Sequence, residues 1–193
     1  MLMWVLVPIG YLFGSVSAAI IVCRCMGLPD PRDQGSKNPG ATNVLRYGGK
    51  MAAGMTLFCD MLKGFLPVFL AATLNADPVV VGAIGISAFL GHLYPIFFGF
   101  KGGKGAATAA GAFFGYYWGL GVIVIATWLV FIKLTRVSSL SAIIAATSAP
   151  LYAWLLIDSA ALVVATLFIS LFTIWRHRIN IKRLLSGEEG RIF

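Results

Sequence analysis

Long uncharged apolar stretches constrain this sequence more than any other feature. About 20 such residues are enough to cross the roughly 30 Å hydrocarbon core of a membrane. Only 11% of the 193 residues are charged, too few to give a soluble globule of this size a polar surface. We therefore predict an all-α integral membrane protein, a single polytopic domain over residues 1–193. The expected spans are Trp4–Val22, Met51–Leu74 (with Asp60 and Lys63 inside it), Val79–Phe100, Ala106–Ile132, Leu140–Ile157 and Ser159–Trp175.

The basic residues predict the orientation. Cytoplasmic connections of membrane proteins carry an excess of Lys and Arg. Here the basic residues fall between the first two runs, on both sides of Ala106–Ile132 and after the last run, whereas Asp77 and Asp158 occupy the opposite connections. We expect the N-terminus outside and the C-terminus in the cytoplasm. No basic residue precedes Trp4 and no cleavage pattern follows Val22, which favours a retained span over a signal peptide.

The run Ala106–Ile132 conflicts with this assignment because both of its ends are basic. A single helix cannot place both ends in the cytoplasm, and 27 helical residues would reach about 40 Å. Two short helices that meet near Gly115–Gly119 resolve the conflict, since glycine permits a turn there. The prediction becomes seven transmembrane helices, some of them short.

The net positive charge, the three cysteines and the spaced glycines are all features expected of an ordinary membrane protein. The net charge of +8 follows from the basic connections, so we expect no nucleic-acid partner. The three cysteines show no disulfide or metal spacing, and we expect neither a metal nor another cofactor. Glycines spaced four apart predict close helix packing: Gly10 with Gly14, and Gly111 with Gly115 and Gly119.

One connection, residues 35–43, combines glycine with hydroxyl and amide side chains and is followed by Arg46. Glycines allow backbone N–H groups to converge on an anion, and Ser, Thr and Asn add neutral donors. An arginine one turn further can bind phosphate with two hydrogen bonds. The alternative is a flexible loop rich in turn formers. The candidate phosphate ligands are Ser36, Asn38, Thr42, Asn43 and Arg46.

A second segment, Lys101–Gly105, leads directly into the alanine-rich start of a predicted helix. Such a helix start presents free N–H groups and a positive dipole end to an anion. The segment is not a P-loop, because its spacing differs from that pattern. Contact with the membrane surface alone is the alternative. The candidate ligands are Gly102, Gly103 and Lys104.

The third segment, Arg176–Arg183, follows the last span and Trp175. His177 and Asn180 are three residues apart and share a helix face, which makes them candidate catalytic residues, although the segment could also simply meet anionic lipid headgroups. We expect His92 to be a buried hydrogen-bonding residue. Asp60 and Lys63 are expected to neutralise each other inside their span.

These segments, taken in order, resemble the bacterial acyl-phosphate:glycerol-3-phosphate acyltransferase (PlsY) family along nearly the whole chain. Lys37 stands where the family often has glycine, and Ala106 where valine is common. The H-x-x-x-x-D pair of other glycerolipid acyltransferases is absent. The resemblance rests on residues 35–43 with Arg46, Asp60–Gly64, Gly91–Pro95, Phe100–Gly105, Thr135–Ser141, Arg176–Arg183 and Leu185–Glu189.

The resemblance implies acyl transfer from acyl phosphate to glycerol 3-phosphate, giving 1-acylglycerol 3-phosphate and phosphate. It implies a location in the bacterial inner membrane with the active site on the cytoplasmic side. Lys104 and its neighbouring glycines are expected to hold the glycerol 3-phosphate, while His177 and Asn180 orient the attacking hydroxyl. The residues expected to hold the acyl-phosphate headgroup are Ser36, Asn38, Thr42, Asn43 and Arg46. The partners expected are the two substrates and membrane lipid, without an obligate protein partner.

The general base is left open between His177 and a substrate phosphate, whose second pKa near 6 suits the task. No arrangement for a covalent acyl-enzyme is visible. A transporter of phosphate or phosphate esters is the main rival function, but the chain is short and shows no internal repeat. A non-catalytic membrane scaffold is the third.

Overall fold

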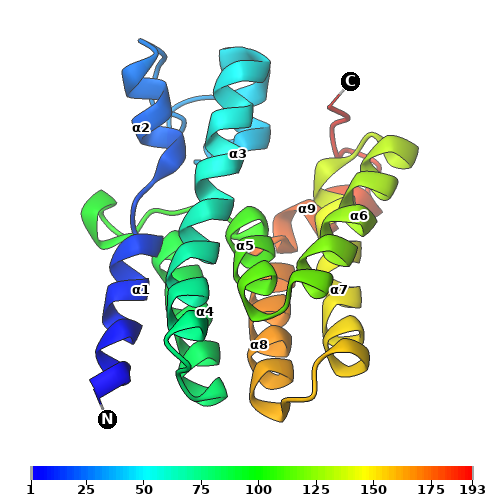
Figure 1. Cartoon of the computed structure of the whole chain (residues 1–193). Coiled ribbons are helices and arrows are strands. Elements are labelled where there is room, and N and C mark those ends of the chain that lie inside the picture. Colours follow the sequence, from blue (N-terminus) through cyan, green and yellow to red (C-terminus); the bar gives the residue numbers. More distant parts are fainter. Residues whose placement is uncertain (1, 193) are drawn as a thin grey trace.

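The computed structural model describes residues 2–192, and it contains helices but no strand in that range. The helices stand side by side as a bundle (Figure 1). Their bounds are η1 Leu2–Val5, α1 Leu6–Gly14, α2 Ala18–Cys25, α3 Ala41–Thr73, α4 Pro78–Leu93, η2 Ile96–Phe98, α5 Ala106–Tyr116, α6 Trp118–Thr135, α7 Ser138–Leu156, α8 Ala160–Arg176 and α9 Arg178–Leu185.

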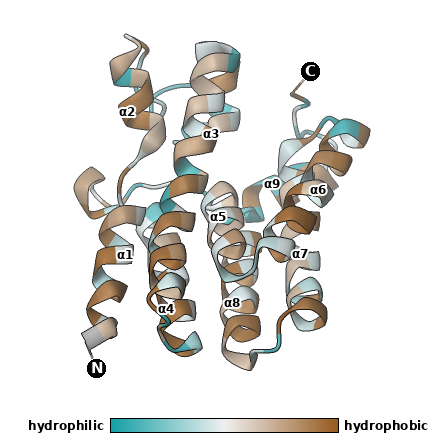
Figure 2. Cartoon of the chain, in the orientation of Figure 1, coloured by the Kyte–Doolittle hydropathy of each residue, from teal (hydrophilic) through white to brown (hydrophobic). Residues whose placement is uncertain are grey.

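The prediction of an all-helical membrane protein is confirmed. Within residues 2–192, four helical segments are long and apolar enough to cross a membrane, and two bent helix pairs, α1 with α2 and α8 with α9, raise the number to six. Hydrophobic residues predominate along most helices, whereas hydrophilic residues gather near α9 and at the ends of several helices (Figure 2). With 11 residues, α5 is about 16 Å long and spans only half of the hydrocarbon core. Length alone therefore does not give seven spanning helices.

The predicted first span, Trp4–Val22, is a bent pair of helices and not one continuous helix. The chain breaks after Gly14 and resumes as α2, and the two segments are bent by 42°. A break inside a membrane helix leaves backbone carbonyls without partners, and these must be satisfied by other groups. The carbonyl of Val16 accepts a hydrogen bond of 2.7 Å from Lys63 Nζ, so a side chain of α3 stabilises the break.

Two other predicted spans have shifted boundaries. The helix expected to start at Met51 begins at Ala41 and contains a kink at Gly49, whose φ of 79° lies in the left-handed region. The span expected over Val79–Phe100 leaves the helix after Leu93, because the residue before Pro95 is pushed out of the helical region, as the ψ of 65° at Tyr94 shows.

The predicted division of Ala106–Ile132 is confirmed. Helices α5 and α6 are separated by Tyr117, whose backbone is extended (φ −159°, ψ 125°), and the two helices pack against each other. Of the two helices predicted to be short, α5 is short, whereas α6 has 18 residues. Figure 1 shows the turn between them well inside the bundle rather than at its end.

Close helix contacts use the predicted glycines. A Cβ atom on Gly14 of α1 would overlap the carbonyl group of Ala88 in α4, and one on Gly111 of α5 would overlap the carbonyl of Met61 in α3. Helices that approach this closely gain van der Waals contact, which drives helix association in lipid. These contacts fix α5 against α3 and α1 against α4.

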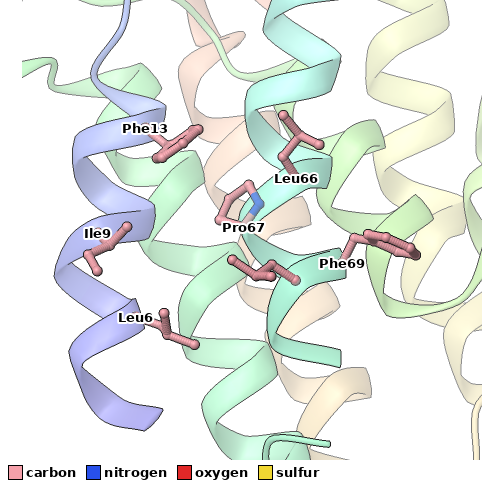
Figure 3. Close-up of a pocket in the computed structure, with 7 residues that line it drawn as sticks. Leu6, Ile9, Phe13, Leu66, Pro67 and Phe69 are labelled. Atoms are coloured by element: carbon pink, nitrogen blue, oxygen red, sulfur yellow. The ribbon is translucent and has the colours of Figure 1, made fainter. Parts of the chain in front are cut away.

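A small apolar pocket of about 240 Å³ lies between α1 and α3 (Figure 3). It offers no charged or hydrogen-bonding side chain. We therefore separate it from the polar cavity described next. Its lining residues are Leu6, Ile9, Phe13, Leu66, Pro67, Phe69 and Leu70.

Candidate functional site

One cavity of about 670 Å³ brings the three predicted segments together. Helices α3, α5, α6 and α7 and the segments around Lys104 and His177 contribute its walls. Every predicted site residue except Gly103 lines it: Ser36, Asn38, Thr42, Asn43, Arg46, Gly102, Lys104, His177 and Asn180. Residues far apart in the sequence therefore form a single site, as the segment compositions indicated.

The loop that carries Ser36 and Asn38 is organised by Asn43. This side chain is 1% exposed and donates hydrogen bonds of 2.9 Å to the carbonyls of Pro31 and Gln34. Its Oδ1 accepts a third from the N–H of Ser36, also at 2.9 Å. All of these contacts hold the loop, so the structure gives Asn43 a positioning contribution in addition to its place in the cavity wall.

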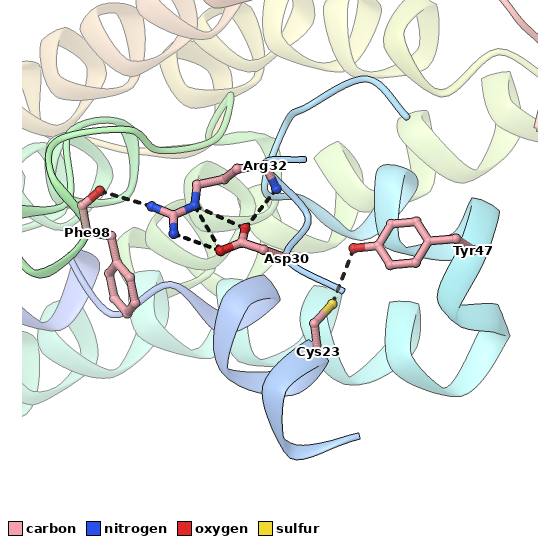
Figure 4. A network of polar contacts seen from close by, with 5 residues as sticks. All are labelled: Cys23, Asp30, Arg32, Tyr47 and Phe98. Atoms are coloured by element: carbon pink, nitrogen blue, oxygen red, sulfur yellow. Dashed lines mark hydrogen bonds and ion pairs between the residues drawn. The ribbon is translucent and has the colours of Figure 1, made fainter. Parts of the chain in front are cut away.

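Arg32 holds the chain segment that leads into this loop (Figure 4). Arg32 Nη2 lies 2.7 Å from Asp30 Oδ2, and Nη1 donates to the carbonyl of Phe98 at 3.4 Å. The guanidinium of Arg32 lowers the pKa of the Asp30 carboxyl below its usual value. Nearby, Cys23 Sγ and Tyr47 OH are 3.4 Å apart. The loop before α3 is thus tied to η2.

Thr42 and Arg46 belong to the first turns of α3 rather than to a loop. Thr42 Oγ1 lies 3.0 Å from Ser138 Oγ at the start of α7. Arg46 is exposed and its guanidinium lies near Gly190, beyond α9. Helix α3 therefore presents a hydroxyl and an exposed guanidinium on the side of the cavity that faces the C-terminal segment.

The glycine segment before α5 is held on two sides. The N–H of Gly103 donates to the carbonyl of His92 at 3.2 Å. Arg176 Nη2 donates to the carbonyls of Gly103 and Gly102 at 2.8 Å and 3.2 Å. Gly103 is therefore a structural part of the site. The segment ends at Gly105 in a left-handed conformation (φ 88°), after which the free N–H groups of the first turn of α5 can bind an anion.

Lys104 begins a chain of hydrogen bonds across the cavity. Its Nζ donates to Asn180 Oδ1 at 2.6 Å. Asn180 Nδ2 in turn donates to Glu189 Oε1 at 2.5 Å, and the same oxygen accepts from Ser139 Oγ at 2.5 Å. Burial lowers the pKa of Lys104 to about 8, while Glu189 opposes this shift. At pH 7 the ammonium is charged and available to an anion.

His177 is buried at the junction of α8 and α9 and lines the cavity. Its Nδ1 lies 2.8 Å from the carbonyl of Thr173. Because a carbonyl only accepts, Nδ1 carries the proton and Nε2 is left as an acceptor. Burial lowers the pKa of His177 to about 4, against the raising effect of the Thr173 hydrogen bond. The imidazole is therefore neutral at pH 7.

One part of the cavity wall is apolar. It is formed by a large aromatic side chain on each of α5 and α6 and by small residues on α7, so that the polar end of the cavity continues into space suited to a hydrocarbon chain. The residues that face this part of the cavity are Phe113, Val124, Ile125, Trp128, Leu129, Ala142, Ala145 and Ala146.

Sequence reasoning did not select three residues of this site: Ser139, Arg176 and Glu189. Ser139 lies at the start of α7, and Arg176 is one of several basic residues that follow the last predicted span. Glu189 follows α9, and nothing in the local pattern shows that its carboxylate reaches α7. All lay within the quoted stretches, but only the tertiary contacts give them a place. Among residues 2–192, no cluster of His, Cys, Asp and Glu is suited to a metal ion.

The fold is that of a membrane-embedded protein, and its cavity, where cationic and N–H groups meet an apolar wall, has the chemistry to accommodate amphipathic phosphate compounds. Comparison with known proteins specifies the class. A family model described as glycerol-3-phosphate acyltransferase matches residues 4–187. The chain belongs to this family and is an acyltransferase of the membrane.

Individual relatives cover almost the entire chain. The glycerol-3-phosphate acyltransferase of Methylococcus capsulatus is 56% identical over 98% of this chain and 96% of its own length. That of Shewanella halifaxensis is 54% identical over 94% and 90%. A crystal structure of PlsY, an integral membrane glycerol 3-phosphate acyltransferase, in its glycerol 3-phosphate form matches with a TM-score of 0.94 and 38% identity, over 99% of this chain and 96% of that one.

The lysophosphatidic acid form of the same enzyme matches with a TM-score of 0.93 and 37% identity, over 99% of this chain and 95% of that one.

Proposed function

We propose that this protein transfers a fatty acyl group from acyl phosphate to glycerol 3-phosphate, giving 1-acylglycerol 3-phosphate and phosphate. The observation that carries the proposal is the single cavity, in which the two segments we expect to bind phosphate adjoin an apolar wall. The related solved structures contain one phosphate substrate and one lysophospholipid by their descriptions. A substrate pair with two phosphates and one hydrocarbon tail matches this cavity, because each phosphate can occupy one segment and the tail can lie along the apolar wall.

The two segments divide the substrates between them. The loop and first turns of α3, with Ser36, Asn38, Thr42 and Arg46, face the acyl-phosphate headgroup, while Asn43 maintains the loop. Lys104 and the N–H groups around Gly102 and the start of α5 bind the phosphate of glycerol 3-phosphate. The acyl tail lies along the apolar wall formed by α5, α6 and α7.

The chemistry requires positioning more than covalent help, because acyl phosphate is already an activated mixed anhydride. The hydroxyl oxygen of glycerol 3-phosphate attacks the acyl carbonyl carbon, an ester bond forms, and the carbon–oxygen bond to phosphate breaks. The hydroxyl proton passes to a substrate phosphate, and the other product is free phosphate. His177 Nε2 and Asn180 orient the attacking hydroxyl, and the cationic groups stabilise the developing charge.

An assay in detergent tests this function directly. Purified protein mixed with acyl phosphate and glycerol 3-phosphate should form lysophosphatidic acid and release equimolar phosphate. A transporter or a scaffold would give no product under these conditions, because a detergent solution has no compartments. Absence of product, in protein that retains its helical circular dichroism spectrum, would overturn the proposal.

The location we propose is the bacterial inner membrane, with the cavity on the cytoplasmic side. Six spans plus the half-length helix α5 give seven membrane-embedded helices, with the N-terminus outside and the C-terminus inside. The distribution of charge supports this orientation, since Asp77 and Asp158 are exposed at one end of the bundle and basic residues collect at the other. Residues 1–193 would form one membrane domain that contacts lipid and the two substrates.

Cysteine labelling tests this orientation. In a variant with Cys23, Cys25 and Cys59 replaced by alanine, a cysteine introduced at Lys133 should react with a membrane-impermeant maleimide only after the membrane is opened. A cysteine introduced at Asp158 should react in spheroplasts with an intact inner membrane. Reaction at Lys133 from the outside would contradict the seven-helix arrangement.

A further inference from the structure

A row of three buried polar side chains crosses the bundle, and two of its members, Asp60 and His92, also line the cavity. Lys63 and Asp60 of α3 have side chains that are 7% and 4% exposed, and His92 of α4 is 6% exposed. Lys63 Nζ lies 2.7 Å from Asp60 Oδ1. The same carboxylate oxygen lies 3.5 Å from His92 Nδ1, and this nitrogen makes no hydrogen bond within residues 2–192. Charges inside a membrane segment are costly, and those that are kept usually have a function.

One end of the row reaches the segment that carries the first phosphate loop. Lys63 Nζ donates to the carbonyl of Val16 at 2.7 Å, in the break between α1 and α2. Helix α2 then leads through residues 26–40 to the first turn of α3. Because these elements share a small core of their own, formed by Ala19, Val22, Cys23, Val44 and Ala52, fixing Val16 fixes the start of the unit that bears Ser36 and Arg46.

The other end of the row supports the glycine segment. The carbonyl of His92 accepts the N–H of Gly103 at 3.2 Å. The ring edge of His92 lies so close to Gly103 that a Cβ atom there would overlap Nε2. Arg176 Nη2 donates a hydrogen bond of 2.8 Å to the carbonyl of Gly103. The place of Gly103, and with it of Lys104, is therefore set by His92 and Arg176.

We propose that Lys63, Asp60 and His92 form a positioning row that fixes the two phosphate-binding segments relative to each other. His92 is the member that determines the affinity for glycerol 3-phosphate, because it supports Gly103 directly. The row acts through Val16 and Gly103, so its members are positioning residues. This inference rests on the function proposed above, which assigns glycerol 3-phosphate to the glycine segment.

A His92→Phe variant tests the row because it keeps an aromatic ring but removes both nitrogens. The KM for glycerol 3-phosphate should rise about 10-fold, because the ring loses its 3.5 Å contact with Asp60, which leaves the buried carboxylate with one partner fewer and the His92 backbone that accepts from Gly103 less firmly held. The kcat should stay within about threefold, since the reacting groups are untouched. Should this variant not fold, His92→Gln and Asp60→Asn are measured in the same way and should raise the same KM.

The matched control is Thr166→Val. Thr166 is also fully buried, but within residues 2–192 its hydroxyl donates to the carbonyl of Leu162 alone, at 2.8 Å and in its own helix. This variant reports the general effect of removing a buried polar group and should leave the KM for glycerol 3-phosphate unchanged. A normal KM in folded His92 variants, or an equal rise in Thr166→Val, would overturn the role of the row.

Lys104→Ala separates a failure of this inference from a failure of the proposed function. If the wild-type enzyme makes lysophosphatidic acid, and Lys104→Ala but no His92 variant raises the KM for glycerol 3-phosphate, then only the positioning row is refuted. If the wild-type enzyme makes no product, the proposed function fails, and with it the substrate assignment on which the row depends.

Discussion

Replacing Lys104 with alanine should lower kcat/KM for glycerol 3-phosphate about 10- to 150-fold. Lys104 supplies the buried ammonium of the glycine segment, and a hydrogen bond to a charged group contributes about 1.5–3 kcal/mol. The KM for acyl phosphate should change much less, because we assign that substrate to the loop and first turns of α3, where Arg46 supplies the charge. Steady-state rates measured with each substrate varied separately check this division.

The pKa of Lys104 also predicts how kcat/KM changes at alkaline pH. The pKa of Lys104 is lowered to about 8 by burial, so the ammonium is charged at pH 7 and loses its proton as the pH rises through 8. Loss of that charge weakens phosphate binding, and kcat/KM should fall above pH 8. In the enzyme–substrate complex the bound phosphate favours the charged form, so the fall in kcat should occur at higher pH.

Two variants control this prediction. Lys104→Arg keeps a charge at all accessible pH values, so its alkaline limb near pH 8 should disappear. Arg46→Ala removes the exposed guanidinium of the other segment and should raise the KM for acyl phosphate instead. If Arg46→Ala and Lys104→Ala weaken the same substrate equally, or leave both substrates unaffected, the assignment of two separate phosphate sites is wrong.

The sequence predicts the helical membrane fold and the three segments that line the cavity, because both depend on local composition. Apolar runs reveal spans without reference to any partner, and the basic ends of Ala106–Ile132 predict the division at Tyr117. The break at Val16 could not be predicted in the same way. It is stable because Lys63, far along the chain, supplies a donor to the freed carbonyl.

The same limit applies to individual site residues. Asn43 fits the composition of a phosphate loop, yet its hydrogen bonds all serve the loop backbone. Glu189 is an acidic residue in a basic segment, and its proximity to Asn180 and Ser139 depends on how the chain returns after α9. Composition therefore identifies the segments that meet, whereas the tertiary fold decides which side chains are left free for a ligand.

Replacing His177 with glutamine should leave the acidic limb of the pH profile in place while lowering turnover about 10-fold. The neutral imidazole offers Nε2 as an acceptor, and loss of one orienting hydrogen bond corresponds to about 1.4 kcal/mol. With its pKa lowered to about 4, His177 is a weak base at pH 7. A substrate phosphate, with a second pKa near 6, is better matched to the proton transfer.

The position of the acidic limb decides between the two bases. If a substrate phosphate takes the proton, kcat/KM should fall as the pH drops through about 6, and this limb should be the same in wild-type enzyme and His177→Gln. If His177 takes the proton, the wild-type limb should lie near its own pKa of about 4. In that case His177→Gln should lose the limb together with about 100-fold or more of its turnover. That result would replace the substrate-assisted mechanism with general-base catalysis by His177.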